Sequence, residues 1–208
     1  SVARCPVYGG KALSWDESKT IAIKGVVKTK RISSGIAVLA TDFWSAKKGR
    51  DALEIVWDEG PNASLSSEKF YSEYKALASE PGMLAEDIGD SLKVLRETKK
   101  TIEAVYEMPY LAHACMEPMN CTAMVEQDNN DMSKITKCEI WSGTQYQSND
   151  QEIVSKLLNI PQQSVTVHRP LIGGSFGRRA SKTADFTVDA VEAANGENVP
   201  VQVIWSRE

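Results

Sequence analysis

The sequence has few cysteines, few histidines and no long apolar run. Its 208 residues include four cysteines and two histidines. No two cysteines form a CxxC pair, and none stands at a zinc-type spacing from either histidine. We therefore expect buried thiols rather than a disulfide framework or a metal cluster at Cys5, Cys115, Cys121 and Cys138. Apolar runs such as 36–40 fall far short of the ~20 residues of a membrane helix, so no membrane span is predicted.

The sequence also lacks an excess of basic residues. Twenty-four basic and 28 acidic side chains give a net charge of −4, which argues against a general nucleic-acid binder. Hydrophobic residues make up 42% and charged residues 25%, an ordinary globular composition. The chain starts at Ser1 inside a predicted strand and has no initiating Met. We therefore expect a piece of a longer protein, and both the bacterial periplasm and the cytoplasm remain open as its location.

Hydrophobic periodicity and turn residues predict an α+β chain in three parts. Residues 1–60 carry predicted strands at 25–32, 35–40 and 54–57, with a helix over 43–52 behind an Asp42 N-cap. Residues 61–100 form a predicted helical connector. Its first helix is capped by Ser67 and stopped by Pro81-Gly82, and its second is capped by Asp90.

Residues 101–208 form the third predicted part. Apolar and polar residues alternate over 101–108, which predicts a half-buried strand. Further strands are predicted near 122–126, 138–141, 165–168 and 199–205. A Ser148/Gln151 capping box predicts a helix that runs to Leu158. The last helix is expected to carry Ala184, Val188 and Val191 on one face, with Gly196 at its C′ position.

The segment from Gly173 to Arg179 carries the clearest chemical signal. It reads Gly-Gly-Ser-Phe-Gly-Arg-Arg and stands between a predicted strand and a predicted helix. Glycines allow positive φ and close approach of a ligand to the amides, and a following helix N-terminus would add positive potential. No Asp or Glu occurs in 153–184, whereas five basic residues do: Lys156, Arg169, Arg178, Arg179 and Lys182. The segment predicts an anion cradle, but by spacing alone a tight turn with solvated arginines is equally consistent.

Two other segments carry weaker signals. His113 and Glu117 are four residues apart and could form a catalytic pair, although Pro118 disfavours a helix there and a structural histidine is the simpler interpretation. Gln145 follows a predicted strand in Trp141-Ser142-Gly143-Thr144-Gln145 and offers a neutral donor and acceptor. Alone, neither segment defines a function.

Together, the segments resemble the large molybdenum-binding subunit of the xanthine oxidase/aldehyde oxidase family, in its isoquinoline 1-oxidoreductase β-subunit form. The resemblance covers nearly the whole chain. It is carried by Pro6–Lys11, Phe43–Leu53, Trp57–Gly60, Tyr110–Asn120, Thr144-Gln145 and Gly173–Arg179. It implies an α/β hammerhead domain over 1–60, followed by the beginning of a molybdenum-cofactor-binding α/β domain.

The resemblance also implies a function and a site. It implies oxidation of aldehydes or N-heteroaromatic compounds with oxygen from water, and a partner iron–sulfur small subunit. The implied cofactor is molybdopterin, as the cytosine dinucleotide in many bacteria, held by the complete protein and absent from a fragment. Gln145 would bond an oxo ligand, and amides near Phe176 and Gly177 would face it. The implied cofactor-binding residues are Gln145, Gly173, Gly174, Ser175, Phe176, Gly177 and Arg178.

The sequence departs from the family pattern at the loop and in its catalytic base. Ser175 stands where the family has a third glycine and could narrow the approach to the cofactor. Arg179-Ala180-Ser181 stands where xanthine-type members carry an acidic substrate-binding residue, which disfavours purines. The Gly-x-Gly-Glu segment with the family's general base does not occur in these 208 residues, so no catalytic residue is assigned. We expect Glu117 to shape the pocket or to be structural, and the fragment to be inactive alone.

Two other functions remain open from the sequence. One is a non-catalytic phosphate- or nucleotide-binding module that uses the glycine loop with Arg178 and Arg179. The other is a structural or subunit-contact domain.

Overall fold

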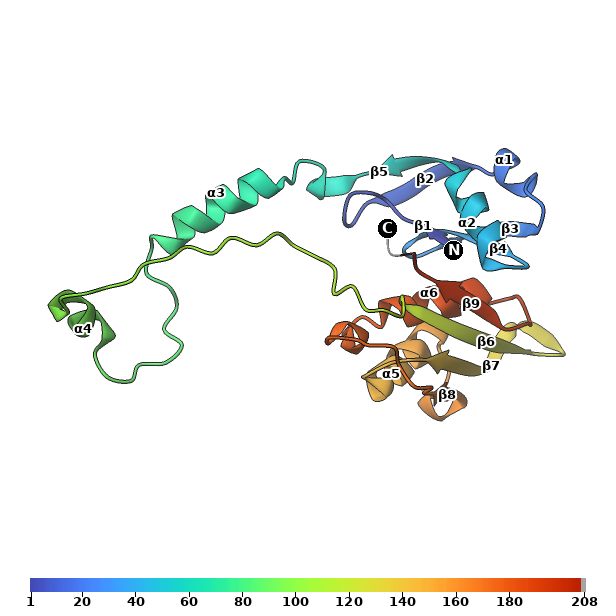
Figure 1. Ribbon diagram of the computed structural model, residues 1–208. Helices are drawn as coiled ribbons and strands as arrows, with labels where there is room; N and C mark the ends of the chain where they lie inside the picture. Colours follow the sequence, from blue (N-terminus) through green and yellow to red (C-terminus); the bar gives the residue numbers. More distant parts are fainter. Residues whose placement is uncertain (207–208) are drawn as a thin grey trace. The chain divides into compact units, whose positions relative to one another are not determined.

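The computed structural model describes residues 1–206, which fall into two compact units (Figure 1). Residues 1–62 and 113 onward form the first unit, and Ala63–Ala112 form the second. The glycine loop and Gln145 both lie in the first unit. The domain boundaries predicted after residues 60 and 100 remain predictions.

The N-terminal part of the first unit contains two small antiparallel sheets. Strands β1 (Val2–Ala3), β4 (Gly35–Ala40) and β3 (Val26–Ile32) pair in the order β1-β4-β3. Strands β2 (Lys11–Asp16) and β5 (Glu54–Asp58) form the second sheet. The connecting elements are α1 (Ser18–Ile21), α2 (Phe43–Asp51) and η1 (Gly60–Asn62). The predicted strands and the Asp42 cap are confirmed, since the Asp42 carboxylate accepts from the Ser45 amide of α2.

The C-terminal part is a four-stranded sheet in the order β8-β7-β6-β9. Its strands are β6 (Asn120–Asp128), β7 (Asp131–Ser142), β8 (Val165–His168) and β9 (Val201–Ile204). Strand β6 pairs antiparallel with both β7 and β9, whereas β7 and β8 are parallel. Alternate residues of β6 are fully buried, because Cys121, Ala123 and Val125 face the helices.

Helices α5 (Gln147–Leu158) and α6 (Asp185–Ala194) pack against this sheet (Figure 1). Helix α5 is the crossover that makes the parallel β7–β8 connection possible, with η2 (Gln162–Ser164) leading into β8. Helix α6 buries Phe186, Ala190 and Val191 in the core. Gly196 takes a φ of +85° just after α6, which confirms its predicted C′ position.

Helix α6 also joins the two parts of the first unit. The Glu192 carboxylate accepts from the Ser33 amide and hydroxyl at the β3–β4 turn, at 2.9 and 2.6 Å. The Ser34 hydroxyl donates to Oδ1 of Asp189, which is buried, at 2.5 Å. The apolar face of α6 therefore packs against the sheet, and its polar face hydrogen-bonds to the β3–β4 turn.

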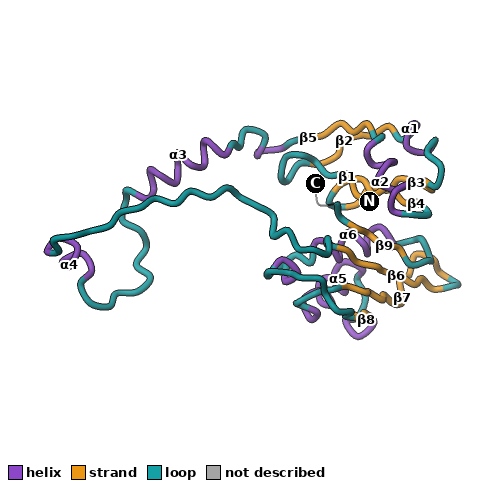
Figure 2. Tube along the Cα trace, in the orientation of Figure 1, coloured by secondary structure: helices purple, strands orange, loops and turns teal. Residues whose placement is uncertain are grey.

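The second unit contains α3 (Ser67–Ala78), α4 (Ser91–Glu97) and segments without regular structure (Figure 2). The Tyr74 and Tyr110 hydroxyls lie 2.5 Å apart, and Lys75 pairs with Glu107 at 2.7 Å. The predicted half-buried strand over 101–108 is wrong. No strand lies in the described second unit to pair with it, and Ile102 and Tyr106 are exposed.

Two predicted helix caps are also wrong in detail. Ser66, one residue before the predicted Ser67, accepts from the Lys69 amide at the start of α3. Helix α5 begins behind Tyr146, which makes no side-chain cap, so the Ser148/Gln151 capping box does not form. The Gln151 side chain instead donates to the Val165 carbonyl at 2.8 Å, and this bond connects α5 to β8.

Among the described residues, no helix combines the length and apolarity that a membrane crossing requires. Cys115, Cys121 and Cys138 are buried as predicted, whereas Cys5 is only half-buried, and none of the four forms a disulfide. Burial raises the pKa of the Cys138 thiol to about 12, so it remains protonated.

Candidate functional site: a loop with two free amides

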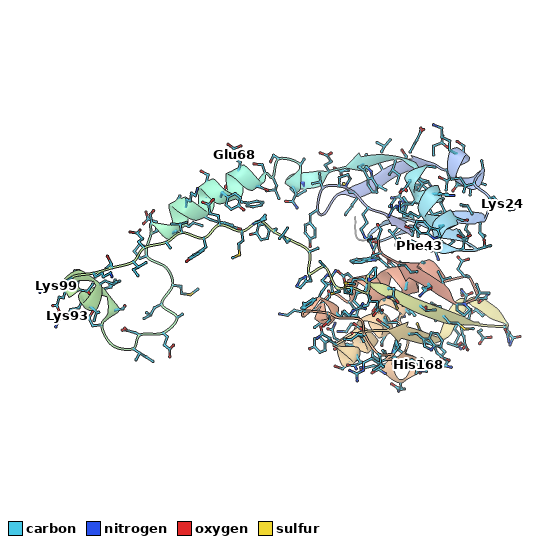
Figure 3. All side chains as sticks on the ribbon, viewed as in Figure 1. Lys24, Phe43, Glu68, Lys93, Lys99 and His168 are labelled. Carbon is cyan, nitrogen blue, oxygen red and sulfur yellow. The ribbon has the colours of Figure 1, made fainter. Side chains whose placement is uncertain are left out.

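The glycine loop leaves the sheet at the end of β8, where His168 stacks on Trp141 and its Nε2 lies 2.8 Å from Glu139 (Figure 3). A single 3₁₀ turn, η3 (Arg178–Ala180), follows the loop. Helix α6 begins only at Asp185, behind Ala184 in the left-handed region. The sequence-based expectation that a helix N-terminus directly follows the loop is therefore wrong, and a helix dipole does not explain the site.

Arg179 is the buried centre of the site, with a side chain that is 0% exposed. Its guanidinium donates to the carbonyls of Gly174 at 3.0 Å, Gly143 at 3.3 Å and Glu117 at 2.9 Å. Its own carbonyl accepts from the Gln145 amide at 3.0 Å and the Thr144 hydroxyl at 3.3 Å. One residue thus joins the three segments that the sequence singled out separately.

Glu117 binds the glycine loop from the other side. Its amide donates to the Gly173 carbonyl at 3.1 Å, and its carboxylate accepts from the Gly173 amide at 2.6 Å and the Asn120 side chain at 2.7 Å. Burial alone would raise the pKa of this carboxyl. The Gly173 amide, Asn120 and nearby Arg179 outweigh that effect, so the pKa lies below its usual value. His113 is exposed and is not among these partners, so the His113–Glu117 pair does not form.

Close packing at Gly173 gives a testable prediction. A Cβ on Gly173 would lie 2.6 Å from the Glu117 Cβ, which real side chains do not tolerate. We expect Gly173→Ala to break the reciprocal Glu117–Gly173 pairing and to lower the free energy of unfolding by about 1–3 kcal/mol. Urea unfolding of the complete protein measures this.

Gly82→Ala is the matched control for that experiment, because a Cβ at Gly82 meets nothing within 4 Å. An equal effect of the two substitutions would contradict the close approach at Gly173.

Two amides of the loop have no acceptor among the described residues, whereas several of its carbonyls are bonded. Its carbonyls point into the protein: that of Gly174 accepts from Arg179, and that of Ser175 accepts from the Cys115 thiol at 3.2 Å and the Arg178 amide at 2.9 Å. Among the described residues, no group accepts from the amides of Phe176 and Gly177. Both residues have positive φ, +51° and +86°. The two amides are therefore available as hydrogen-bond donors to a ligand.

Phe176 and Ser175 divide the loop into an outer and an inner side. The Phe176 side chain is 75% exposed, and its left-handed backbone stores about 1 kcal/mol of strain, a feature common at functional sites. Ser175 is 9% exposed and lies on the inner side. The narrowing of the approach to the cofactor by Ser175 stays a prediction.

Gln145 is placed beside the loop by the Arg179 carbonyl and by buried Thr144. Its side chain is exposed and makes no hydrogen bond to the described residues. Its amide group is therefore available to a ligand.

The charges of Arg178 and Arg179 are already satisfied. Arg178 forms a bidentate pair with Asp185, at 3.2 and 2.6 Å, and Arg179 binds carbonyls. Lys156 likewise pairs with Glu152. Three of the five basic residues are thus paired within the chain, whereas Arg169 and Lys182 are exposed. The two guanidinium groups predicted for a nucleotide-binding module are therefore both engaged within the chain.

Sequence reasoning missed the bracketing role of Arg179, whose buried guanidinium joins several segments through their carbonyls, and the contact of Cys115 with the loop. A solvated arginine and a buried one cannot be told apart in a sequence, so only the structure shows the difference. The Gly-rich turn with an adjacent arginine was a signal for the loop, and Gly143 was a signal for close packing. A Cβ on Gly143 would lie 2.6 Å from Ile172 and 3.2 Å from the Arg179 guanidinium.

The fold of this chain occurs in solved oxidoreductase structures. Solved structures with this fold include quinoline 2-oxidoreductase from Pseudomonas putida 86, with a TM-score of 0.67, 16% identity and coverage of 100% of this chain and 30% of that one. CO dehydrogenase from Oligotropha carboxidovorans has a TM-score of 0.65 and 17% identity, with coverage of 100% and 31%. The chain belongs to the molybdopterin cofactor-binding domain family, whose pattern matches residues 77–208.

Curated relatives agree with this family. Isoquinoline 1-oxidoreductase subunit beta of Brevundimonas diminuta is 27% identical over 98% of this chain and 26% of its own length. The xanthine dehydrogenase molybdenum-binding subunit of Escherichia coli O157:H7 is 24% identical over 96% of this chain and 26% of its own length. The chain thus spans about a quarter of these relatives. The predicted resemblance and α+β fold class are confirmed.

Proposed function

We propose that this chain forms the part of a molybdenum hydroxylase subunit that positions the metal end of a molybdopterin cofactor, as the cytosine dinucleotide. The observation that carries the proposal is the pair of free amides at Phe176 and Gly177, beside the free side chain of Gln145. These three donors are neutral groups that suit anionic oxygen atoms, and the charged side chains of Arg179 and Glu117 hold the segments that carry them. The donor set therefore fits the cofactor.

When bound, the cofactor would supply the redox chemistry. The residues of this chain bind and orient. The Phe176 and Gly177 amides and the Gln145 side chain would donate hydrogen bonds to the cofactor. Arg179 and Glu117 connect the glycine loop to the segment around Glu117. Glu117 is occupied by Gly173 and Asn120, so it does not serve as a base.

The complete protein would oxidise an aldehyde or N-heteroaromatic substrate with oxygen from water. Electrons would leave through an iron–sulfur small subunit. The general base would come from a segment beyond these residues, so this chain alone would be inactive. Two relatives support these substrate classes by name, isoquinoline 1-oxidoreductase and the membrane-bound aldehyde dehydrogenase of Gluconacetobacter polyoxogenes.

Gln145→Leu tests the proposal in the complete protein, co-expressed with its small subunit. The substitution removes one donor without burying a new polar group. We expect molybdenum and pterin content to fall roughly tenfold or more, because loss of one hydrogen bond to a charged group costs about 1.5–3 kcal/mol. The thermal midpoint of the cofactor-free protein should not change, because the Gln145 side chain is exposed and makes no hydrogen bond to the described residues.

Gln163→Leu is the matched control, since Gln163 is an exposed glutamine in η2. Wild-type protein purified without molybdenum or pterin would contradict the proposed function. So would equal cofactor content in the two variants.

A further inference from the structure

The glycine loop is followed by an aromatic–cation stack that reaches the N-terminal part of the first unit. Trp205, just after β9, has two guanidinium groups over its ring. That of Arg178 is 5.3 Å from the ring centroid, and that of Arg4 is 4.3 Å from it. Arg178 is the residue directly after Gly177, and Arg4 directly follows β1.

Helix α6 supplies the counter-charges for both arginines. Asp185 accepts both bonds of Arg178, and buried Asp189 pairs with Arg4. These two aspartates are one helical turn apart, so their carboxylates share one face of α6. Asp189 also accepts from the Trp205 indole at 3.0 Å, which fixes the ring between the two ion pairs.

The arrangement is unusual because two cations share one ring. Like charges repel, and each guanidinium would be unfavourable there without its own aspartate. Each cation–π contact contributes about 0.5–1 kcal/mol at partly exposed sites. The stack is therefore a set of contacts in which Asp185, Arg178, Trp205, Arg4 and Asp189 depend on one another.

We infer that Trp205 and Arg4 are positioning residues for the cofactor loop, acting through Arg178. The inference rests on the proposed function, which makes the loop the cofactor contact. Two neighbouring residues anchor η3. Arg179 bonds to the Glu117 carbonyl, and Arg178 lies over the Trp205 ring of the stack. The amides of Phe176 and Gly177 therefore keep their positions only while β1 and α6 hold Arg178 in place.

Hydrogen exchange of the complete protein tests this inference without relying on activity. The reporters are the Arg178 and Ala180 amides, which donate to Ser175 and Gly177 at 2.9 and 3.0 Å. In Trp205→Leu we expect exchange over 175–180 to speed up roughly fivefold, as loss of about 1 kcal/mol of cation–π energy implies. Exchange in β6 should not change. In Trp205→Phe, which keeps an aromatic ring, part of the protection should return.

The chain contains a matched control stack. Arg31 lies over Trp15 at 4.9 Å, and the Trp15 indole donates to Thr29 at 2.9 Å. Trp15→Leu should leave exchange over 175–180 unchanged. Equal acceleration in Trp15→Leu and Trp205→Leu would overturn the inference, as would wild-type exchange in folded Trp205→Leu.

Arg4→Gln decides the question if Trp205→Leu does not fold. The Arg4 side chain is 35% exposed, and this substitution leaves the Trp205 side chain itself unchanged. Faster exchange over 175–180 in this variant supports the coupling, and unchanged exchange overturns it. Wild-type protein without cofactor would contradict the proposed function, whereas the exchange data decide the coupling independently of cofactor.

Discussion

Replacement of Arg179 by methionine is expected to lower the free energy of unfolding by about 3–5 kcal/mol and to abolish cofactor retention. Methionine fills much of the same volume but donates no hydrogen bond. The carbonyls of Gly143, Gly174 and Glu117 would then lose their shared donor. Glu117 would also lose the positive charge 3.4 Å from its carboxylate.

Urea unfolding and molybdenum analysis of the complete protein measure the two effects. Arg179→Lys should recover only part of the stability, because an ammonium group lacks the planar fork that reaches several carbonyls at once. Arg169→Met is the matched control, since Arg169 is an exposed arginine before the same loop. A destabilisation of Arg179→Met no larger than that of Arg169→Met would contradict the bracketing role.

Replacement of Asp150 by asparagine is expected to stabilise the protein at pH 8 but not at pH 4. Asp150 is 2% exposed between α5 and the sheet, and its Oδ2 has no partner among the described residues. Burial raises its pKa to about 6, although Thr144 and Thr187 nearby oppose the shift. An aspartate that is harder to ionise in the folded state favours folding at low pH and disfavours it at high pH.

The sign of the effect follows from the two pKa values. The folded pKa of about 6 lies above the ordinary 3.8, so the wild-type protein loses stability as the pH rises from about 4 to 6. Above pH 6 the loss is complete, at about 2–3 kcal/mol. An asparagine side chain at this position carries no charge at any pH, so the gain in Asp150→Asn should grow over the same interval. Thermal midpoints at pH 4, 6 and 8 measure it.

Asp131→Asn is a control with the opposite sign. Asp131 is exposed, and hydrogen bonds from Ser133 hold its pKa below the usual value. Its charged form favours folding, so this variant should be less stable above pH 4. A gain of Asp150→Asn that is the same at all three pH values would contradict the buried, ionisable Asp150.

Local structure was predictable wherever neighbouring residues decide it. The Asp42 and Asp90 caps form as predicted, because a carboxylate and an amide three residues later need no distant partner. Strands β3 and β4 also follow from their own β-branched residues. Residues 101–108 show the limit. Their alternation is that of a strand, but a strand forms only where another one pairs with it.

The chemistry of the site was half predictable. The backbone freedom of Gly174 and Gly177 follows from the residue type, and both have positive φ. The positive φ of Phe176 does not follow from its type and depends on the bonds that turn the loop carbonyls inward.

The sequence by itself determined the family, the order of the motif segments and the presence of a flexible glycine turn, because these depend on residue identity and spacing. Only the tertiary structure decided what the two adjacent arginines do. Arg178 bonds to Asp185 and lies over Trp205, whereas buried Arg179 bonds to four carbonyls. A guanidinium binds an anion, a ring or a carbonyl with similar ease, so its role depends on which of them the fold brings within reach.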